Sequence, residues 1–216
     1  MKHKPIFITA TNTHVGKTYA TVKLIEDLSQ KGLKVGVMKP IETGVVTSPE
    51  DGVLLFETAK KYNLDLASLT LSDIVPYAFE LPAAPYVAKG RRRIDLEKLQ
   101  KTYTTIEALS DIVLIEGAGG LLVPIEEDVY MYDFIRLFDA RVLLVGHDRL
   151  GCINDILLNL HLLDSLGVSD YEWCVNFKDN RVDFEKMALP FLKKLFGHVL
   201  SLQEDRPKII KSLVHF

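Results

Sequence analysis

The chain has 216 residues, of which 48% are hydrophobic and 25% are charged, an ordinary composition for a globular protein that buries a core. A formal net charge of -3 gives no general attraction to nucleic acid or anionic membranes, and no stretch is apolar for long enough to span a bilayer. Cys152 and Cys174 stand far apart and in no metal-ligand spacing, which favours a reducing compartment. We therefore expect a cytoplasmic protein, with no nucleic-acid or membrane partner, that folds as a single domain over residues 1–216.

Short runs rich in β-branched residues and leucine recur along the chain. In chain order they are PIFITAT, KVGVMKP, DIVLIEG, RVLLVGH and YEWCVNF, with HVLSL as a sixth and weaker run. Their apolar residues are nearly continuous rather than alternating, which is typical of strands covered on both faces of a parallel sheet.

Helical spacing of apolar residues separates these runs. It extends over residues 17–32, 91–110, 151–167 and 183–197, and we expect the last segment to bend at Pro190. Strands that alternate with helices predict βαβ units, so the fold class is α/β: a doubly wound, mostly parallel sheet with helices on both faces, as in P-loop NTPases. Ligands of such sheets bind beyond the carboxyl ends of the strands, where chemistry should be sought.

The first strand is followed by a segment that ends like a phosphate-binding loop. The common P-loop pattern is Gly-x-x-x-x-Gly-Lys-[Ser/Thr], and Gly16, Lys17 and Thr18 match its end. Thr11 stands in place of the first glycine, with Ala10 before it. Lys17 would reach the β- and γ-phosphates and Thr18 would ligate Mg²⁺. An ordinary strand-to-helix turn is the alternative, but the position directly after the first strand favours a nucleotide site.

Charged residues follow two further strands. Lys39 ends the run KVGVMK at the same sheet edge as the loop, although most lysines simply lie at the surface. Glu116 ends DIVLIE as a Walker B carboxylate does, and burying it is costly unless its charge is used. Asp51 begins the next helix and is either a helix cap or a metal ligand, which the sequence leaves open. Gly117 and Gly119 in EGAGG let the backbone approach a ligand closely.

Two asparagines and a histidine are weaker candidates. Asn176 lies at a later strand end, where its amide could read the edge of a purine. Asn154 begins a helix, where asparagine is also an ordinary residue. His14 lies inside the loop and could approach phosphate.

Taken in order, these segments resemble the dethiobiotin synthetase family of P-loop ligases. The likeness rests on TNTHVGKT, MKPIETG, VPYAFELPAAPYVA, VLIEGAGGLLVP, LGCIN and Asn176, and it covers roughly residues 6–176. EGAGG followed by LGCIN is more specific than any single motif. Ala10 stands where the family has glycine, a difference of one methyl group.

The resemblance implies a homodimer that forms dethiobiotin from 7,8-diaminopelargonate and CO₂, with ATP as co-substrate and Mg²⁺ as cofactor. It implies that Lys17 and Lys39 are catalytic and face phosphate and carbamate. The implied nucleotide and cofactor contacts are Thr13, His14, Val15, Gly16, Lys17, Thr18, Asp51, Glu116, Gly117, Ala118, Gly119 and Asn176, with Thr18, Asp51 and Glu116 as metal ligands. The implied diamine contacts are Thr13, Thr43, Gly119 and Asn154, the last at the subunit interface.

Beyond Asn176 the likeness fades. FGHVLSLQED stands where the family has a Gly-x-[Ile/Leu]-Pro segment that clasps adenine, which predicts weaker selectivity for ATP over other nucleoside triphosphates. The main alternative function is a switch ATPase of the partition or septum-positioning type, whose loop carries an extra early lysine that this chain lacks. The apolar tail RPKIIKSLVHF would suit either membrane targeting or docking on the domain.

Overall fold

A five-stranded parallel sheet runs through the computed structural model, which describes residues 2–178 and 180–214. Its strand order is β2-β5-β1-β8-β9. In chain order the strands are β1 (Ile6–Ala10), β2 (Val35–Met38), β5 (Ile112–Glu116), β8 (Arg141–His147) and β9 (Tyr171–Asn176). All five were predicted as strands from their continuous apolar runs. The sixth run forms no strand and pairs with β9 through a parallel bridge between Val175 and Ser201.

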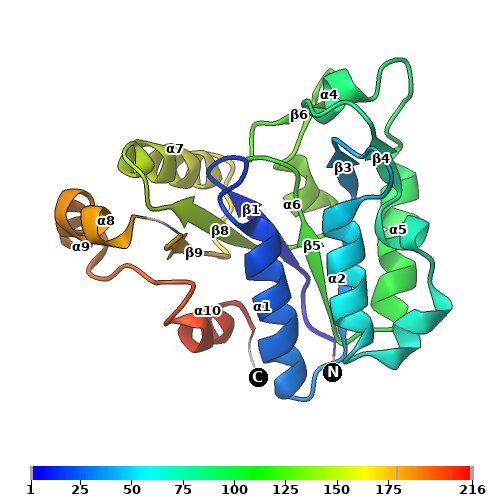
Figure 1. Cartoon of the computed structure of the whole chain (residues 1–216), viewed down its shortest axis with the longest axis horizontal. Coiled ribbons are helices and arrows are strands. Elements are labelled where there is room, and N and C mark those ends of the chain that lie inside the picture. The colour runs from blue at the N-terminus through cyan, green and yellow to red at the C-terminus, as the bar shows by residue number, and fades with distance from the viewer. Residues whose placement is uncertain (1, 179, 215–216) are drawn as a thin grey trace.

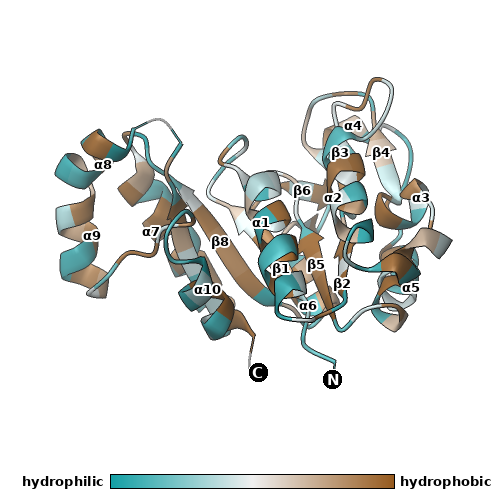
Figure 2. Ribbon diagram, turned by 60° about the horizontal axis from the view of Figure 1, so that its bottom comes forward, coloured by the Kyte–Doolittle hydropathy of each residue, from teal (hydrophilic) through white to brown (hydrophobic). Residues whose placement is uncertain are grey.

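Helices cover both faces of this sheet, which confirms the predicted doubly wound α/β class. Figures 1 and 2 show α1 and α2 in front of the sheet and α5, α6 and α7 behind it, around strands that are strongly hydrophobic. Their bounds are α1 (Lys17–Gln30), α2 (Glu50–Lys60), α5 (Leu96–Ala108), α6 (Asp133–Leu137) and α7 (Cys152–Ser165). The helices bury their apolar stripes on the sheet, as Ala20, Leu24 and Leu28 of α1 do.

Small elements above the sheet edge were not predicted. β3 (Ile41–Thr43) pairs with β4 (Tyr77–Phe79) in parallel, and β6 (Pro124–Glu126) pairs with β7 (Val129–Tyr130) in antiparallel. The short helices η1 (Leu64–Ser68), α3 (Leu71–Ile74) and α4 (Pro85–Ala88) lie between them in the chain. Strands of two or three residues carry too short a pattern to separate them from loops.

The helix expected to bend at Pro190 is two helices. α8 (Arg181–Met187) ends before Ala188, and α9 (Leu189–Phe196) has Pro190 in its first turn. Proline has no N–H to donate there and its ring excludes the preceding turn, so it starts a new helix more easily than it continues one. The ring of Phe196 packs edge-on against Trp173 at 5.1 Å and joins this pair of helices to β9.

The apolar tail docks on the domain. α10 (Arg206–Leu213) buries Ile209, Ile210 and Leu213 in the main core, and residues 215–216 lie outside the described part of the chain. Arg206 also pairs with Asp27 of α1 at 2.6 Å. Within the described residues no helix combines the length and apolarity needed to cross a membrane. A single domain over residues 1–216 stays a prediction.

Candidate nucleotide and metal site

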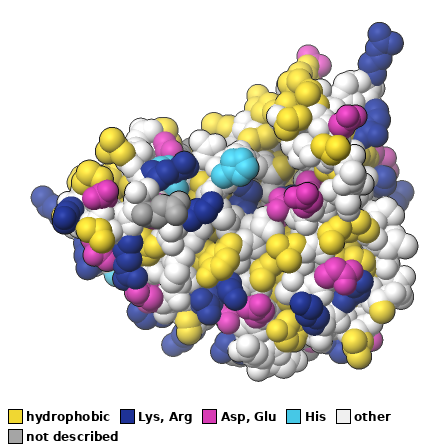
Figure 3. All heavy atoms as spheres, viewed as in Figure 1, with side chains coloured by type: hydrophobic (Ala, Val, Ile, Leu, Met, Phe, Trp, Pro, Cys, Tyr) yellow, Lys and Arg dark blue, Asp and Glu magenta, His cyan; other side chains and the backbone are white. Residues whose placement is uncertain are grey.

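A cavity of about 370 Å³ opens at the carboxyl ends of the strands, where the fold predicts a ligand. It is lined by Thr13, His14, Gly16, Lys17, Thr18, Lys39, Glu42, Thr43, Asp51, Ala118, Gly119 and Lys178. Most of the residues proposed from the sequence therefore meet in one place. Figure 3 shows both basic and acidic side chains spread over this face of the molecule.

The loop between β1 and α1 takes the shape that its sequence end predicts. Gly16 precedes the first residue of α1 with φ 108°, a left-handed conformation that strains other residues. A Cβ atom at Gly16 would also lie 2.2 Å from Nδ2 of Asn176, so glycine is required there twice over. Ala10 is fully buried at the end of β1 and is not among the residues with positive φ, whereas His14 is, with φ 59°. The methyl group at Ala10 is therefore compatible with the loop.

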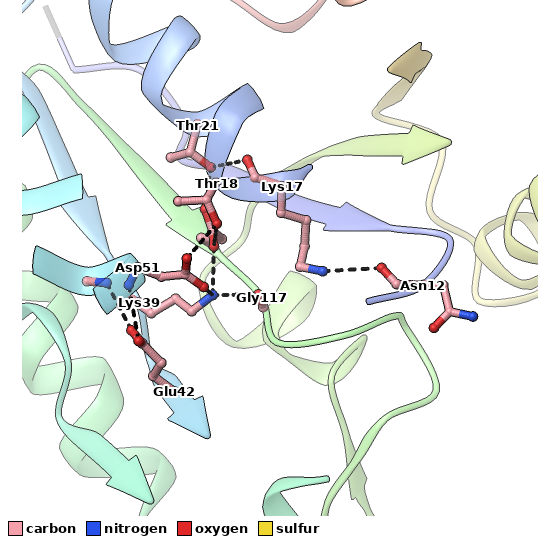
Figure 4. Close-up of polar contacts among 10 residues, drawn as sticks. Asn12, Lys17, Thr18, Thr21, Lys39, Glu42, Asp51 and Gly117 are labelled. Atoms are coloured by element: carbon pink, nitrogen blue, oxygen red, sulfur yellow. Dashed lines mark hydrogen bonds and ion pairs between the residues drawn. The ribbon is translucent and has the colours of Figure 1, made fainter. Parts of the chain in front are cut away.

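A buried ion pair joins two neighbouring strand ends. Lys39 Nζ lies 2.6 Å from Glu116 Oε1, and the two residues are 3% and 0% exposed. β2 and β5 are adjacent and parallel, with Met38 opposite Ile115, so these side chains emerge together. Figure 4 shows the Lys39 ammonium beside Asp51 and the Gly117 carbonyl. Burial alone would lower the pKa of Lys39, but Glu116 and then Asp51 outweigh it and hold that pKa above its ordinary value. Lys39 is therefore a fixed positive charge.

The hydroxyl group of Thr18 and the carboxylates of Asp51 and Glu116 lie together at the start of α1. The Thr18 hydroxyl lies 3.0 Å from Asp51 Oδ1 and 2.9 Å from Glu116 Oε1, and Thr21 donates to Glu116 Oε2 at 2.7 Å. Asp51 is the second residue of α2 and makes no cap of its own helix, so its carboxylate is available to the cavity.

These donors fit a small divalent cation. Oxygen is the ligand that Mg²⁺ prefers, and octahedral ligands about 2.1 Å from the ion lie about 3 Å from their neighbours, which is how far the Thr18 hydroxyl lies from Asp51 Oδ1 and from Glu116 Oε1. The described residues contain no cluster of three or more His, Cys, Asp or Glu side chains suited to a metal. Thr18, Asp51 and Glu116 differ from such a cluster because they supply two carboxylates and one hydroxyl group. Thr18, Asp51 and Glu116 could thus hold Mg²⁺ together with phosphate oxygens.

Lys17 faces the same cavity from the first turn of α1. Its ammonium lies 3.4 Å from the carbonyl oxygen of Asn12, and the residue is 8% exposed. Burial, and then repulsion from Lys39, lower the pKa of Lys17 to about 8. Two confined ammonium groups beside the amide groups of a helix N-terminus form an environment suited to a polyphosphate.

Sequence reasoning missed Glu42, which positions Asp51. The carboxylate oxygens of Glu42 accept hydrogen bonds from the backbone N–H groups of Asp51 at 3.1 Å and Gly52 at 2.9 Å. Pro49 precedes α2 and supplies no side-chain cap, so Glu42 satisfies two free N–H groups at this helix end. Glu42 directly precedes Thr43, a predicted substrate contact, and this position was the one sequence signal for it. Its contact joins β3 to the start of α2, and the sequence does not show that these two elements meet.

A second hollow of about 390 Å³ adjoins the first. The two share Thr13, His14, Thr43, Ala118 and Gly119, and the second extends to Pro82, Ala83, Ala84, Pro85 and Val123. It therefore offers a less polar wall next to the charged cavity.

The remaining candidates lie in different places. Val15 and Asn176 are buried, and the Asn176 amide donates to the Val15 carbonyl at 2.7 Å. The Gly117 carbonyl accepts a hydrogen bond from Lys39 at 3.3 Å. Asn154 is exposed on α7, bonds to Asp155 at 3.2 Å and lines neither hollow.

Known proteins share the fold. The sequence profile of the AAA domain family matches residues 4–170. The MinD cell division protein of Aquifex aeolicus has a TM-score of 0.54 at 18% identity, with 97% of this chain and 86% of that one covered. A ParA family ATPase of Chlorobium tepidum has a TM-score of 0.57 at 12% identity, with 97% and 89% covered. Fold, loop and strand-end carboxylate together define a P-loop protein.

Curated relatives are similar over nearly their whole length. The ATP-dependent dethiobiotin synthetase BioD of a Sulfurovum species is 43% identical over 208 residues, which cover 96% of this chain and 99% of that protein. The BioD proteins of Wolinella succinogenes and Helicobacter pylori are 36% and 37% identical, with 98% and 87% of this chain covered, and 98% and 88% of their own lengths. The chain belongs to the dethiobiotin synthetase family.

The buried ion pair can be tested by a double-mutant cycle in the absence of nucleotide. Lys39→Met and Glu116→Gln should each lower the free energy of unfolding by about 3 kcal/mol, because each leaves a buried charge without its main partner. The double variant removes both charges and should recover at least about 2 kcal/mol relative to the sum of the single losses. Urea unfolding measures all four proteins, and strictly additive losses would show that the two charges are not coupled.

The geometry of the loop leads to a second prediction, which concerns the presence or absence of a methyl group at Ala10 and Gly16. Ala10→Gly should leave the Kd for Mg-ATP unchanged within about twofold and cost about 1 kcal/mol of stability, since glycine is the more flexible residue. Gly16→Ala should weaken Mg-ATP at least about tenfold, because of backbone strain and the clash with Asn176. Isothermal titration calorimetry measures both constants. Tighter binding by the Ala10→Gly variant would mean that the alanine distorts the loop.

Proposed function

We propose that this chain is an ATP-dependent cyclo-ligase that converts 7,8-diaminopelargonate and CO₂ into dethiobiotin, with release of ADP and phosphate. The observation that carries the proposal is that Lys17 and Lys39 open on one cavity that continues into a less polar hollow. A triphosphate suits the first space and a diamine with an alkyl chain suits the second. The BioD names of relatives similar over nearly full length support the same reaction.

The nucleotide phosphates would lie against the loop. Backbone amides from Thr13 to Thr18 and the Lys17 ammonium supply positive partial and full charges at the start of α1. Thr18, Asp51 and Glu116 would hold Mg²⁺, which supplies charge neutralisation on the β- and γ-phosphates when it is bound.

Lys39 is assigned to the reacting groups. One substrate amine adds to CO₂ and loses a proton to give a carbamate, whose oxygen attacks the γ-phosphorus as ADP leaves. The second amine then attacks the carbamoyl carbon and loses a proton, the C–O bond to the phosphate breaks, and hydrogen phosphate leaves as the ureido ring closes. Negative charge builds up on the carbamate and on the transferring phosphoryl oxygens, and a fixed ammonium beside them lowers the barrier. Lys39 can serve this purpose because its pKa is raised, so it stays charged.

The diamine would be held where the two hollows meet. Thr13, Thr43 and Gly119 line both spaces, which supports assigning them to contacts with the amines. The wall from Pro82 to Pro85 can cover the alkyl chain. We assign Asn154 to the substrate carboxylate across the interface of a homodimer, in accord with its exposed position at the start of α7.

A switch ATPase of the partition or septum-positioning type is not favoured. The MinD and ParA proteins compared above are 18% and 12% identical to this chain, so their likeness concerns the fold. The loop carries His14 and no lysine before Lys17, and the tail packs into the core through α10. Cytoplasmic location remains part of the proposal, and the free cysteines Cys152 and Cys174 accord with it.

The proposal predicts ATP hydrolysis that requires both diaminopelargonate and bicarbonate, measured as phosphate release. Lys39→Ala should lower kcat by about two to three orders of magnitude with a smaller change in the KM for ATP, because Lys39 acts mainly on charge that develops during the reaction. Lys23→Ala, which removes a surface partner of Glu26, is the matched control and should keep its activity. Hydrolysis indifferent to the diamine would refute the proposed reaction.

A further inference from the structure

The segment that follows α9 lies alongside β9 and brings Gln203 to the end of that strand. The Val175 N–H donates to the Leu200 carbonyl at 2.8 Å, and the Leu202 N–H donates to the Val175 carbonyl at 2.9 Å. This short parallel pairing places Gln203, the next residue, beside Asn176 and Phe177. It is the part of the chain where the likeness to the family motifs fades.

The amide of Gln203 can take one orientation. Its Oε1 accepts a hydrogen bond from the Phe177 N–H at 3.2 Å, and its Nε2 donates to the Phe177 carbonyl at 3.0 Å. A backbone N–H can only donate and a carbonyl can only accept, so a flipped amide would lose both bonds. The Nε2 group also donates to Asn176 Oδ1 at 2.7 Å.

This orientation is passed on to Asn176 and to the phosphate-binding loop. Because Asn176 Oδ1 faces the Gln203 donor, its Nδ2 must point the other way, where it donates to the Val15 carbonyl at 2.7 Å. The same Nδ2 lies only 2.2 Å from the position that a Cβ atom of Gly16 would take. Asn176 is 5% exposed, so it has little freedom to turn away.

The turn that carries Gln203 is itself anchored. The Ser201 N–H donates to Asp205 Oδ2 at 3.0 Å, and the Asp205 N–H donates to the Ser201 carbonyl at 2.8 Å. The next residue, Arg206, pairs with Asp27 on α1, the helix that begins at the loop. Gln203 therefore lies in a turn that is fixed by hydrogen bonds between Ser201 and Asp205 and by the ion pair of Arg206.

We propose that Gln203 is a positioning residue that sets the conformation of the phosphate-binding loop through Asn176. The inference rests on the nucleotide site of the proposed function, but it concerns the binding of the triphosphate group and not the later chemistry. Removing Gln203 should release the Asn176 amide and with it the Val15 carbonyl and the close contact at Gly16. The loop would then bind any triphosphate less well, whatever base it carries.

A different role, reading of the purine by the same amides, would have a different signature. Gln203 lines a hollow of about 360 Å³ together with Phe177, Lys178, Asn180 and Arg181, where a base could lie. However, both polar atoms of its amide are engaged by Asn176 and Phe177. Base reading would act on nucleotides selectively, whereas loop positioning acts on the phosphates that all of them share.

The test compares Mg-ATP, Mg-GTP and magnesium tripolyphosphate, which has no base, by isothermal titration calorimetry without the diamine. In Gln203→Leu and in Gln203→Glu, which keeps the shape but cannot donate to Asn176, all three ligands should bind about tenfold more weakly. Gln100→Leu removes an exposed amide bond to the Leu137 carbonyl and is the matched control, expected to stay within about twofold. Thermal unfolding of each variant confirms that the folded state is compared.

A second measurement separates this role from general stability. Gln203→Leu combined with Asn176→Ala should bind tripolyphosphate no more weakly than Asn176→Ala alone, because Gln203 acts through Asn176. Fully additive losses, a loss confined to ATP, or unchanged binding of tripolyphosphate would each overturn the inference. Since no diamine is present, these outcomes are independent of whether the chain forms dethiobiotin.

Discussion

The buried ion pair of Lys39 and Glu116 is the interaction around which the site is built. Two charges removed from water lose several kcal/mol of hydration each, so such a pair persists only where the backbone holds it in good geometry. β2 and β5 provide that geometry because they are neighbouring parallel strands that end at the same edge. The pair adds little to stability by itself. Its value is that it keeps a charged ammonium in a confined space where an anion can reach it.

The other polar groups of the site are arranged around this pair. Thr18 and Thr21 bring the start of α1 to Glu116, and Asp51 approaches Lys39 from α2. Glu42 then fixes the start of α2 by bonding to its free N–H groups. Each contact joins elements that come from different parts of the chain, so the sheet order is what assembles the site.

Much of the fold and the centre of the site were predictable from sequence, and the reasons are local. β1, β2, β5, β8 and β9 have continuous apolar runs, and ligands of such sheets bind at the carboxyl ends of the strands, so the strand order was not needed to nominate Lys39 or Glu116. Glu42 and Gln203 were not found because their function depends on backbone groups brought near them by tertiary structure. The break at Ala188 was expected only as a bend, since the pattern on both sides of Pro190 is helical. Asn154 lines neither hollow, so its assignment to the substrate carboxylate comes from the resemblance to the family.

We propose that Lys17, Lys39 and the adjoining hollow serve to join CO₂ to a diamine at the expense of ATP. The most direct test is to incubate the protein with Mg-ATP, diaminopelargonate and ¹³C-bicarbonate and to analyse the products by mass spectrometry and carbon NMR. The expected product is a cyclic urea that carries one labelled carbon, formed in equal amount with ADP and phosphate. ADP formed without a labelled cyclic product would contradict the proposal.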